Sequence, residues 1–133
     1  MPQRSHEDAL TNVEVAIPAA AANSNTPSID LGTDPLVTIE SVELEVSTDD
    51  LPAAFASAAT ITVTVQDSAD NASFAPAVGL ATIVHTGTGA AIDGLNRRVK
   101  LQPGVRRYVR LNVALSSGGG ALTAYKAYGK LKY

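Results

Sequence analysis

The stretch Thr60-Ile-Thr-Val-Thr-Val-Gln66 decides the fold class of this chain. Its apolar residues Ile61, Val63 and Val65 alternate with threonines, and a period of two is typical of a β-strand that buries one face. The stretch therefore predicts a strand whose valine and isoleucine side chains point into a core and whose threonines face outwards.

Further segments on both sides of this stretch have strand patterns. The alternation in Val105 to Leu115 predicts two faces. One carries the apolar residues Val105, Val109, Leu111, Val113 and Leu115, and the other carries Arg106, Tyr108, Arg110 and Asn112. In residues 36–46 the apolar parity changes after Ile39, so a β-bulge is expected near Glu40 or Ser41, with Glu43 and Glu45 facing outwards. The other expected strands are Thr11 to Ile17, Gly79 to Thr86, Arg97 to Leu101 and Leu122 to Lys132.

Turn signals separate most of these strands. Asp49 to Ala59 is expected to be a loop, and Asp67 to Asn71 a turn. The glycines in Gly87-Thr-Gly89 and Ser116-Ser-Gly-Gly-Gly120 predict hairpin turns, and Gln102-Pro-Gly104 predicts another turn. Short strands of this kind, without a long helix, predict an all-β protein, an antiparallel β-sandwich or jelly roll.

The first part of the chain is low in bulky residues. Pro18 to Pro27 consists of alanines and turn formers, with too few residues between its prolines for a stable helix. We therefore expect an extended N-terminal arm over residues 1–35 and the β-sandwich (jelly-roll) domain over residues 36–133.

Composition fits one domain with a thin core. The 133 residues include 33 Val, Leu, Ile and Phe and 22 alanines, which bury little area each. Stability is therefore expected to come partly from association. The absence of cysteine excludes disulfides, thiolate zinc sites and cysteine nucleophiles. No apolar run approaches the ~20 residues that span a bilayer, and the polar start Met1 to Asp8 predicts no signal peptide.

Charge is distributed unevenly along the sequence. Residues 1–96 carry all 13 acids and one base, Arg4, whereas residues 97–133 carry nine bases and no acid. One interpretation is nucleic-acid binding through clustered arginine and lysine. A second places the basic strands beside acidic ones within the fold or across a subunit contact, which the acidic net charge and scarce aromatics favour. A third is a protein with faces of opposite sign that docks onto a charged neighbour.

No motif predicts a metal, a cofactor or an enzyme. Asp67, Asp70 and Asn71 carry oxygens that suit calcium, but their spacing is more typical of a turn. His6 and His85 have no further ligands at metal-site spacing. The segment Ile83 to Gly89 lacks the Gly-Lys-Ser/Thr of a phosphate loop, and the chain has no Gly-x-Ser-x-Gly nucleophile motif.

Arg106-Arg-Tyr-Val-Arg110 is the densest cluster that suggests a function. Positive charge there either protects an edge strand from unwanted pairing or forms a docking face for an acidic partner, and the two are compatible. With the basic last strand, the cluster predicts these partner-binding residues: Arg106, Arg107, Tyr108, Arg110, Lys126, Tyr128 and Lys130.

Three stretches in order resemble a known family. They are Ser28-Ile-Asp-Leu-Gly32, Ala59 to Phe74, and Leu101 to Asn112 with the glycine turn and Leu122-Thr-Ala124 that follow. The order is similar to that of the capsid cement, or decoration, proteins of tailed bacteriophages, of the Bordetella phage cement protein type. The resemblance implies a jelly-roll subunit that assembles as trimers on the outside of the capsid and clamps neighbouring major capsid proteins. The start Met1 to Asp8 has no counterpart in it.

The expected function is that of a structural virion protein with no enzymatic activity. It would be made in the host cytoplasm, bind the outer capsid surface as a homotrimer and stabilise contacts between major capsid proteins, without direct contact to nucleic acid or membrane. The alternative is a phage tail or surface accessory β-sandwich that binds host glycan. That alternative requires exposed aromatic side chains beside a groove, for which Tyr108, Tyr125 and Tyr128 are the candidates.

Overall fold

The computed structural model describes residues 12–19, 21–31, 43–77, 80, 82–101, 104–116 and 122–132. All of the regular structure in these ranges is β, and they contain no helix that could cross a membrane. The strands are β1 (Asn12–Ala16), β2 (Ala22–Asn25), β3 (Ile29–Asp30), β4 (Glu43–Thr48), β5 (Thr60–Ser68), β6 (Ala75–Pro76), β7 (Ile83–Thr86), β8 (Asn96–Lys100), β9 (Tyr108–Leu115) and β10 (Lys126–Lys132).

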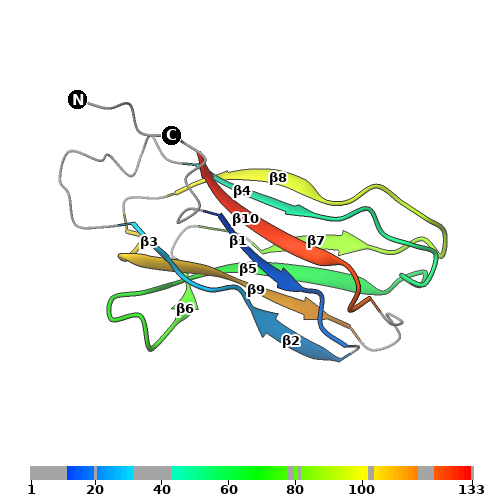
Figure 1. The fold of residues 1–133 in the computed structure, drawn as a ribbon, viewed down its shortest axis with the longest axis horizontal. Helices are drawn as coiled ribbons and strands as arrows, with labels where there is room; N and C mark the ends of the chain where they lie inside the picture. Colours follow the sequence, from blue (N-terminus) through cyan, green and yellow to red (C-terminus); the bar gives the residue numbers. More distant parts are fainter. Residues whose placement is uncertain are drawn as a thin grey trace.

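The strands form two antiparallel sheets that pack face to face (Figure 1). The four-stranded sheet has the order β1-β10-β4-β8. The six-stranded sheet has the order β2-β9-β5-β6, with β3 also paired to β9 and β7 also paired to β5. The prediction of an all-β antiparallel sandwich is thus confirmed.

The path of the chain through the two sheets is that of a jelly roll. Apart from the step from β5 through β6 to β7, each move to the next principal strand changes sheet. The short strands β2 and β3 follow each other along β9, and β6 and β7 follow each other along β5. Each sheet is therefore four strand positions wide, as in an eight-stranded double-sheet jelly roll.

The core lies between the sheets where the alternating residues meet. The exposed fraction of Ile61 and Val63 on β5 is 0%, and their register partners on β9 are equally inward. The predicted inward faces of β5 and β9 are confirmed, as is the inward parity of Leu44 and Val46 on β4. Phe55, from the predicted loop between β4 and β5, is fully buried in the same cluster.

Both predicted hairpins are wrong. β7 and β8, on either side of Gly87-Thr-Gly89, belong to different sheets, and so do β9 and β10, on either side of the second glycine run. Glycine marks a change of direction, but it does not specify which strand the chain pairs with next. Gly87 has a different requirement, because a Cβ at this position would overlap the backbone oxygen of Ala56.

The described part of residues 1–35 is extended and belongs to the sandwich. β1 is the strand that the alternation in Thr11 to Ile17 predicted. It pairs with β10, and Ile17 and Ile29 are buried in the common core. The strand β2 was not expected, because Ala22-Asn-Ser-Asn25 has no apolar alternation. Between β2 and β3 the register against β9 changes by one residue, which is a β-bulge, and the Thr26 hydroxyl there accepts the Leu111 N–H at 3.0 Å.

Some predictions concern residues outside the described part of the chain. They are the bulge near Glu40 or Ser41, most of the turn at Gln102 to Gly104, the start Met1 to Asp8 and His6. The remaining strand predictions agree with the structure in type, and the bounds differ. β9 begins at Tyr108 rather than at Val105, and β5 continues to Ser68, two residues beyond the predicted end.

Candidate partner-binding surfaces

Much of the uneven charge of the sequence is paired within the fold. Five ion pairs among the described residues each join an acid from residues 14–67 to a base from residues 98–126. Arg98 on β8, for example, lies beside Glu43 and Glu45 on the adjacent strand β4. The arrangement is that of the second interpretation, in which basic strands lie beside acidic ones within the fold.

Arg106 is engaged by Asp67, a carboxylate at the end of β5. Asp67 has the same parity as the core residues of this strand, and its side chain is 2% exposed. It accepts the Arg106 backbone N–H at 2.9 Å and the guanidinium Nε and Nη2 at 2.9 and 2.7 Å. The guanidinium also donates to the Asp67 carbonyl oxygen at 2.9 Å. Because a buried carboxylate is costly without such bonds, Arg106 serves to hold the chain before β9 against β5.

Arg107 forms a forked pair with Asp30 on β3. The two N–H···O distances are 2.8 and 3.0 Å, and both side chains remain more than 40% exposed. The hydrogen bond to Asp30 raises the pKa of Arg107 above its ordinary value. The guanidinium carbon also lies 5.0 Å from the centre of the Tyr108 ring, a cation–π distance. This pair ties the N-terminal strand β3 to β9 at the surface.

Arg110 lies on the outer face of the six-stranded sheet. Its Nε donates to Gln66 Oε1 at 2.9 Å, and its guanidinium stacks 3.9 Å above the Phe74 ring. Neither partner neutralises its charge, so Arg110 presents a positive group on a face whose outward residues on β5 are uncharged: Thr60, Thr62, Thr64 and Gln66.

Three of the predicted residues lie on β10, in the other sheet. Lys126 pairs with Glu14 on β1 at 3.2 Å, and its backbone N–H donates to Asp49 Oδ2 at 2.9 Å. Tyr128 donates its hydroxyl to Asp49 Oδ1 at 2.9 Å. This hydrogen bond, then burial and the Asp49 charge, raise the pKa of Tyr128 above its ordinary value. Lys130 has the same outward parity on this strand, since Ala127 and Leu131 are the buried residues.

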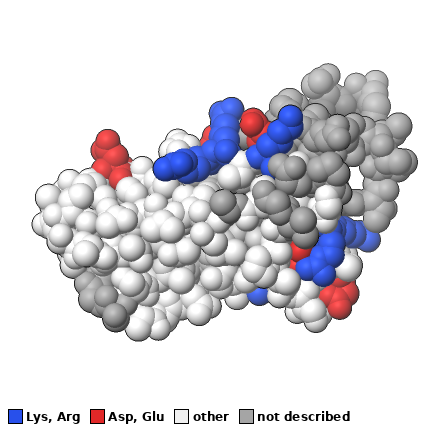
Figure 2. All heavy atoms as spheres, turned by 180° about the vertical axis from the view of Figure 1, so that it is seen from behind, with Lys and Arg blue, Asp and Glu red and all other residues white. Residues whose placement is uncertain are grey.

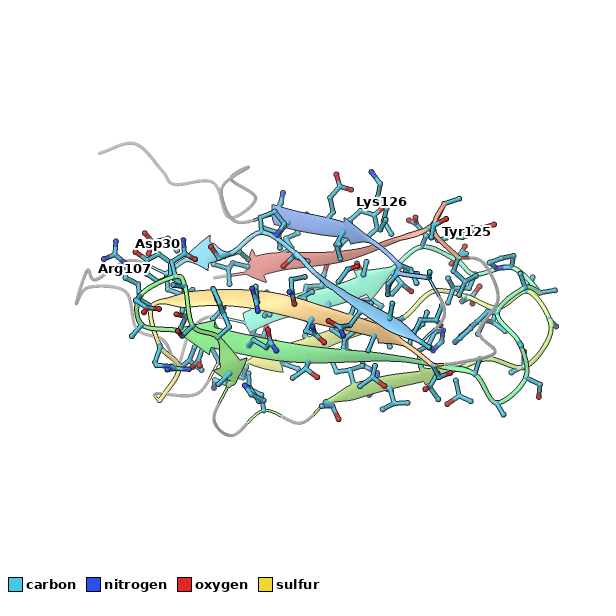
Figure 3. The ribbon with its side chains drawn as sticks, turned by 90° about the horizontal axis from the view of Figure 1, so that it is seen from below. Asp30, Arg107, Tyr125 and Lys126 are labelled. Atoms are coloured by element: carbon cyan, nitrogen blue, oxygen red, sulfur yellow. The ribbon has the colours of Figure 1, made fainter. Side chains whose placement is uncertain are left out.

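The structure does not bring the seven predicted residues together. The first four, here called the arginine end, lie on β9 of the six-stranded sheet or just before it: Arg106, Arg107, Tyr108 and Arg110. The other three, here called the lysine face, lie on β10 of the four-stranded sheet: Lys126, Tyr128 and Lys130. Arg107 with Asp30 lies at one end of the sandwich, and Lys126 with Tyr125 lies towards the other (Figure 3). The chain therefore has two separate charged surfaces instead of one.

The segment Asp67 to Asn71, for which a turn was predicted and a calcium site was considered, uses its carboxylates within the fold. Asp70 accepts the backbone N–H groups of Ala72 and Ser73, each at 3.0 Å, and the Ser68 hydroxyl at 2.8 Å. These bonds lower its pKa to about 2. Asp67, by contrast, is engaged by Arg106. Within the described residues, no group of three or more candidate ligands could hold a metal ion.

Sequence reasoning missed a groove between the two sheet edges. It has a volume of about 410 Å³ and is lined by Thr82, Ile83, Val84, Arg97, Arg98 and Val99, which we call the edge groove. A signal was present, because the inward series Leu95, Val99 and Leu101 is interrupted by Arg97. Figure 2 shows one face of the molecule, on which basic side chains with acidic ones beside them lie along the upper margin above a broad uncharged surface.

A second hollow lies at the loop end of the sandwich. Its volume is about 560 Å³, and Asp50, Asp93 and Tyr125 line it together with the apolar residues Leu51, Pro52 and Ile92 and with Ala91. Asp50 Oδ1 accepts the Gly94 N–H at 2.8 Å, which fixes one carboxylate on the rim. Of the predicted aromatic residues, Tyr125 is thus the one beside this hollow.

Comparison with known proteins places the chain in a family. No curated protein matches it. A family model, Bbp16, matches residues 11–130, which is 120 of the 133 residues and includes all of the described strands except the last two residues of β10. The name of the family suggests a Bordetella phage protein. The chain belongs to the Bbp16 family.

Proposed function

We propose that this protein is a bacteriophage capsid cement, or decoration, protein. The observation that carries the proposal is the Bbp16 match over nearly the whole chain, because it links the chain to a phage. The jelly roll agrees with the architecture that the resemblance to cement proteins implies. The partners are the major capsid protein and further copies of this chain, as a homotrimer on the outer capsid surface.

The proposed mechanism is added interface area between capsid subunits. The arginine end and the lysine face lie on different sheets, so one subunit can contact two neighbours at once. Stable interfaces bury about 800 Å² on each partner, and an accessible surface of 7061 Å² leaves room for more than one. Surface charges such as the exposed Arg107 and the half-buried Arg110 would make these contacts dependent on salt.

Capsid occupancy tests the proposal. Capsids of the phage that encodes this chain are prepared without it, the purified protein is added back, and bound protein is measured by sedimentation at low and high salt. Saturable binding that weakens with salt and raises the temperature of capsid disruption is expected. No binding to these capsids at any salt concentration would contradict the proposal.

A paired variant tests the arginine end in the same assay. Changing Arg107 and Arg110 together to glutamate is expected to reduce occupancy, because both side chains are exposed enough to reach a partner. Arg106 stays unchanged in this variant, because its loss would disturb the fold through Asp67. If the double variant is fully folded and its capsid occupancy is unchanged, the arginine end is not part of the contact with the capsid.

The hollow beside Tyr125 favours one alternative function, binding of a host glycan. An aromatic side chain next to carboxylates is a suitable arrangement for stacking on a sugar and bonding its hydroxyls, and Tyr125, Asp50 and Asp93 provide it. A glycan array with the purified protein tests this function. Binding that disappears in Tyr125→Ala would support it, and an array without signal would contradict it.

A further inference from the structure

The edge groove lies between two strands that each have a free side. Among the residues that the structure describes, β8 is the last strand of the four-stranded sheet and pairs only with β4, and β7 pairs only with β5. An edge strand presents backbone N–H and C=O groups that no strand of the same chain uses. The groove thus combines two free strand edges with a partly apolar lining of Ile83, Val84 and Val99.

The charge of the groove is not balanced by the fold. The β8 residues Arg98 and Lys100 stand directly opposite Glu45 and Glu43 in the β4 register. Arg97 has the opposite parity and stands across from the buried Val46. Among the described residues the exposed side chain of Arg97 makes no hydrogen bond or ion pair, so the groove holds an uncompensated positive charge.

Val84 gives the groove an exposed apolar contact. It is the one large apolar side chain of the described residues that counts as exposed, with an exposed fraction of 50%. Exposed apolar groups beside charge are typical of surfaces that a partner covers. The apolar and the charged feature thus belong to one site.

We propose that the edge groove binds an extended acidic segment of a partner protein, which adds as a strand to the free edge of β8. Its carboxylates would face Arg97, and an apolar side chain would cover Val84 and Ile83, as in β-strand addition. The partner class follows from charge complementarity. The inference deepens the proposed function, on which it rests for the source of the segment, a neighbouring capsid subunit.

A competing explanation is that the charge of Arg97 protects the edge strand β8 from pairing with other chains. An arginine at an inward position of an edge strand discourages pairing with other chains. If that were its whole role, its replacement would increase self-association and no acidic segment would bind at the groove. The two explanations therefore predict opposite results for peptide binding.

The test uses a fluorescein-labelled peptide of eight residues that alternates glutamate and valine, titrated with the full chain. Two control peptides separate the contributions: one has lysine in place of glutamate, and one has N-methyl groups that remove alternate backbone N–H donors. Fluorescence anisotropy gives the affinity. Amide chemical shifts in labelled protein show whether β7 and β8 are the elements affected.

Arg97→Glu and Arg110→Glu form a matched pair, because both change the net charge equally and Arg110 lies on the outer face away from the groove. Arg97→Glu is expected to weaken binding of the acidic peptide by about tenfold or more, and Arg110→Glu by less than about twofold. Val84→Thr, which removes apolar contact at similar volume, is expected to weaken it severalfold.

Equal binding of the lysine peptide or of the N-methylated peptide would overturn the proposal, as would equal effects of the two arginine variants. The result is separable from that for the cement function. Capsid binding by the unchanged protein without peptide binding at the groove would reject the groove and keep the function. Peptide binding at the groove without capsid binding would reject the cement function and keep the groove as a site for acidic segments.

Discussion

The two arginines Arg106 and Arg97 have different roles in the sandwich. Arg106 precedes β9 and bonds a carboxylate whose side chain is 2% exposed. Arg97 on β8 interrupts an inward apolar series, and within the described residues its side chain makes no hydrogen bond or ion pair. The arginine from the dense sequence cluster thus serves the fold, whereas the arginine whose charge the fold leaves free lies at the edge groove.

The difference shows that density of charge in a sequence is a poor guide to a binding surface. In the arginine end, each guanidinium has a partner from a distant part of the chain: Asp67, Asp30 and Gln66. These contacts hold β3, β5 and β9 together. A free charge is recognised by comparing each cation with its neighbours across the sheet, which requires the register.

The largest expected effect comes from Asp67→Asn. The substitution removes the negative charge that accepts three bonds from Arg106 and leaves a buried amide, so we expect a loss of about 2–3 kcal/mol of unfolding free energy. Urea unfolding followed by circular dichroism measures it. Asp30→Asn is the matched control, because it breaks the exposed pair with Arg107 and should have a much smaller effect. If the two variants lost equal unfolding free energy, the buried pair Asp67–Arg106 would contribute no more than the exposed pair Asp30–Arg107, which would contradict the prediction.

The lysine face offers a smaller effect that depends on pH. The folded pKa of Tyr128 is raised above 10.0 by its hydrogen bond to Asp49. A raised pKa contributes stability that is present below pH 10 and is lost as the pH rises through the folded value. In Asp49→Asn the pKa of Tyr128 should fall towards its ordinary value, as monitored by NMR titration of the tyrosine ring. An unchanged Tyr128 titration in this variant would contradict the assigned cause.

The smallest expected effect concerns Asp70, three residues from Asp67. Its pKa is lowered to about 2 by bonds from Ser73, Ser68 and Ala72, although it is exposed. Its stabilising contribution is present above the ordinary value of 3.8 and is lost as the pH falls through about 2. NMR titration of its carboxyl carbon checks the pKa, and a midpoint near 3.8 would contradict it. Asp70→Asn should lower stability at neutral pH by less than Asp67→Asn does, because the asparagine oxygen can still accept the same bonds at an exposed position.

Alternation in the sequence predicted the strands and their buried faces well, because a period of two reports which side chains point inwards. It could not predict the change of sheet between β7 and β8 or between β9 and β10, since both sheets bury the same kind of face. β2 was missed because its alanines, asparagines and serine carry no apolar signal, and its pairing depends on the bulge and on β9.

The sequence identified the candidate arginine and lysine residues, but it did not identify the residues that they contact within the fold. Asp67 follows Gln66 in a stretch typical of a turn, and its inward position shows only when β5 continues to Ser68. The edge groove is formed by β7 and β8, whose adjacency depends on the jelly-roll path. Neither feature can be derived from local patterns.

We expect that Arg106 stabilises the fold and that Arg97 does not. This expectation is tested most directly by comparing the unfolding free energy of Arg106→Gln with that of Arg97→Gln. Both changes remove one positive charge. We predict a loss of about 1–3 kcal/mol for Arg106→Gln, which leaves Asp67 buried without its charged partner. We predict a change within about 0.5 kcal/mol for Arg97→Gln. Equal losses, or a larger loss for Arg97→Gln, would contradict the account.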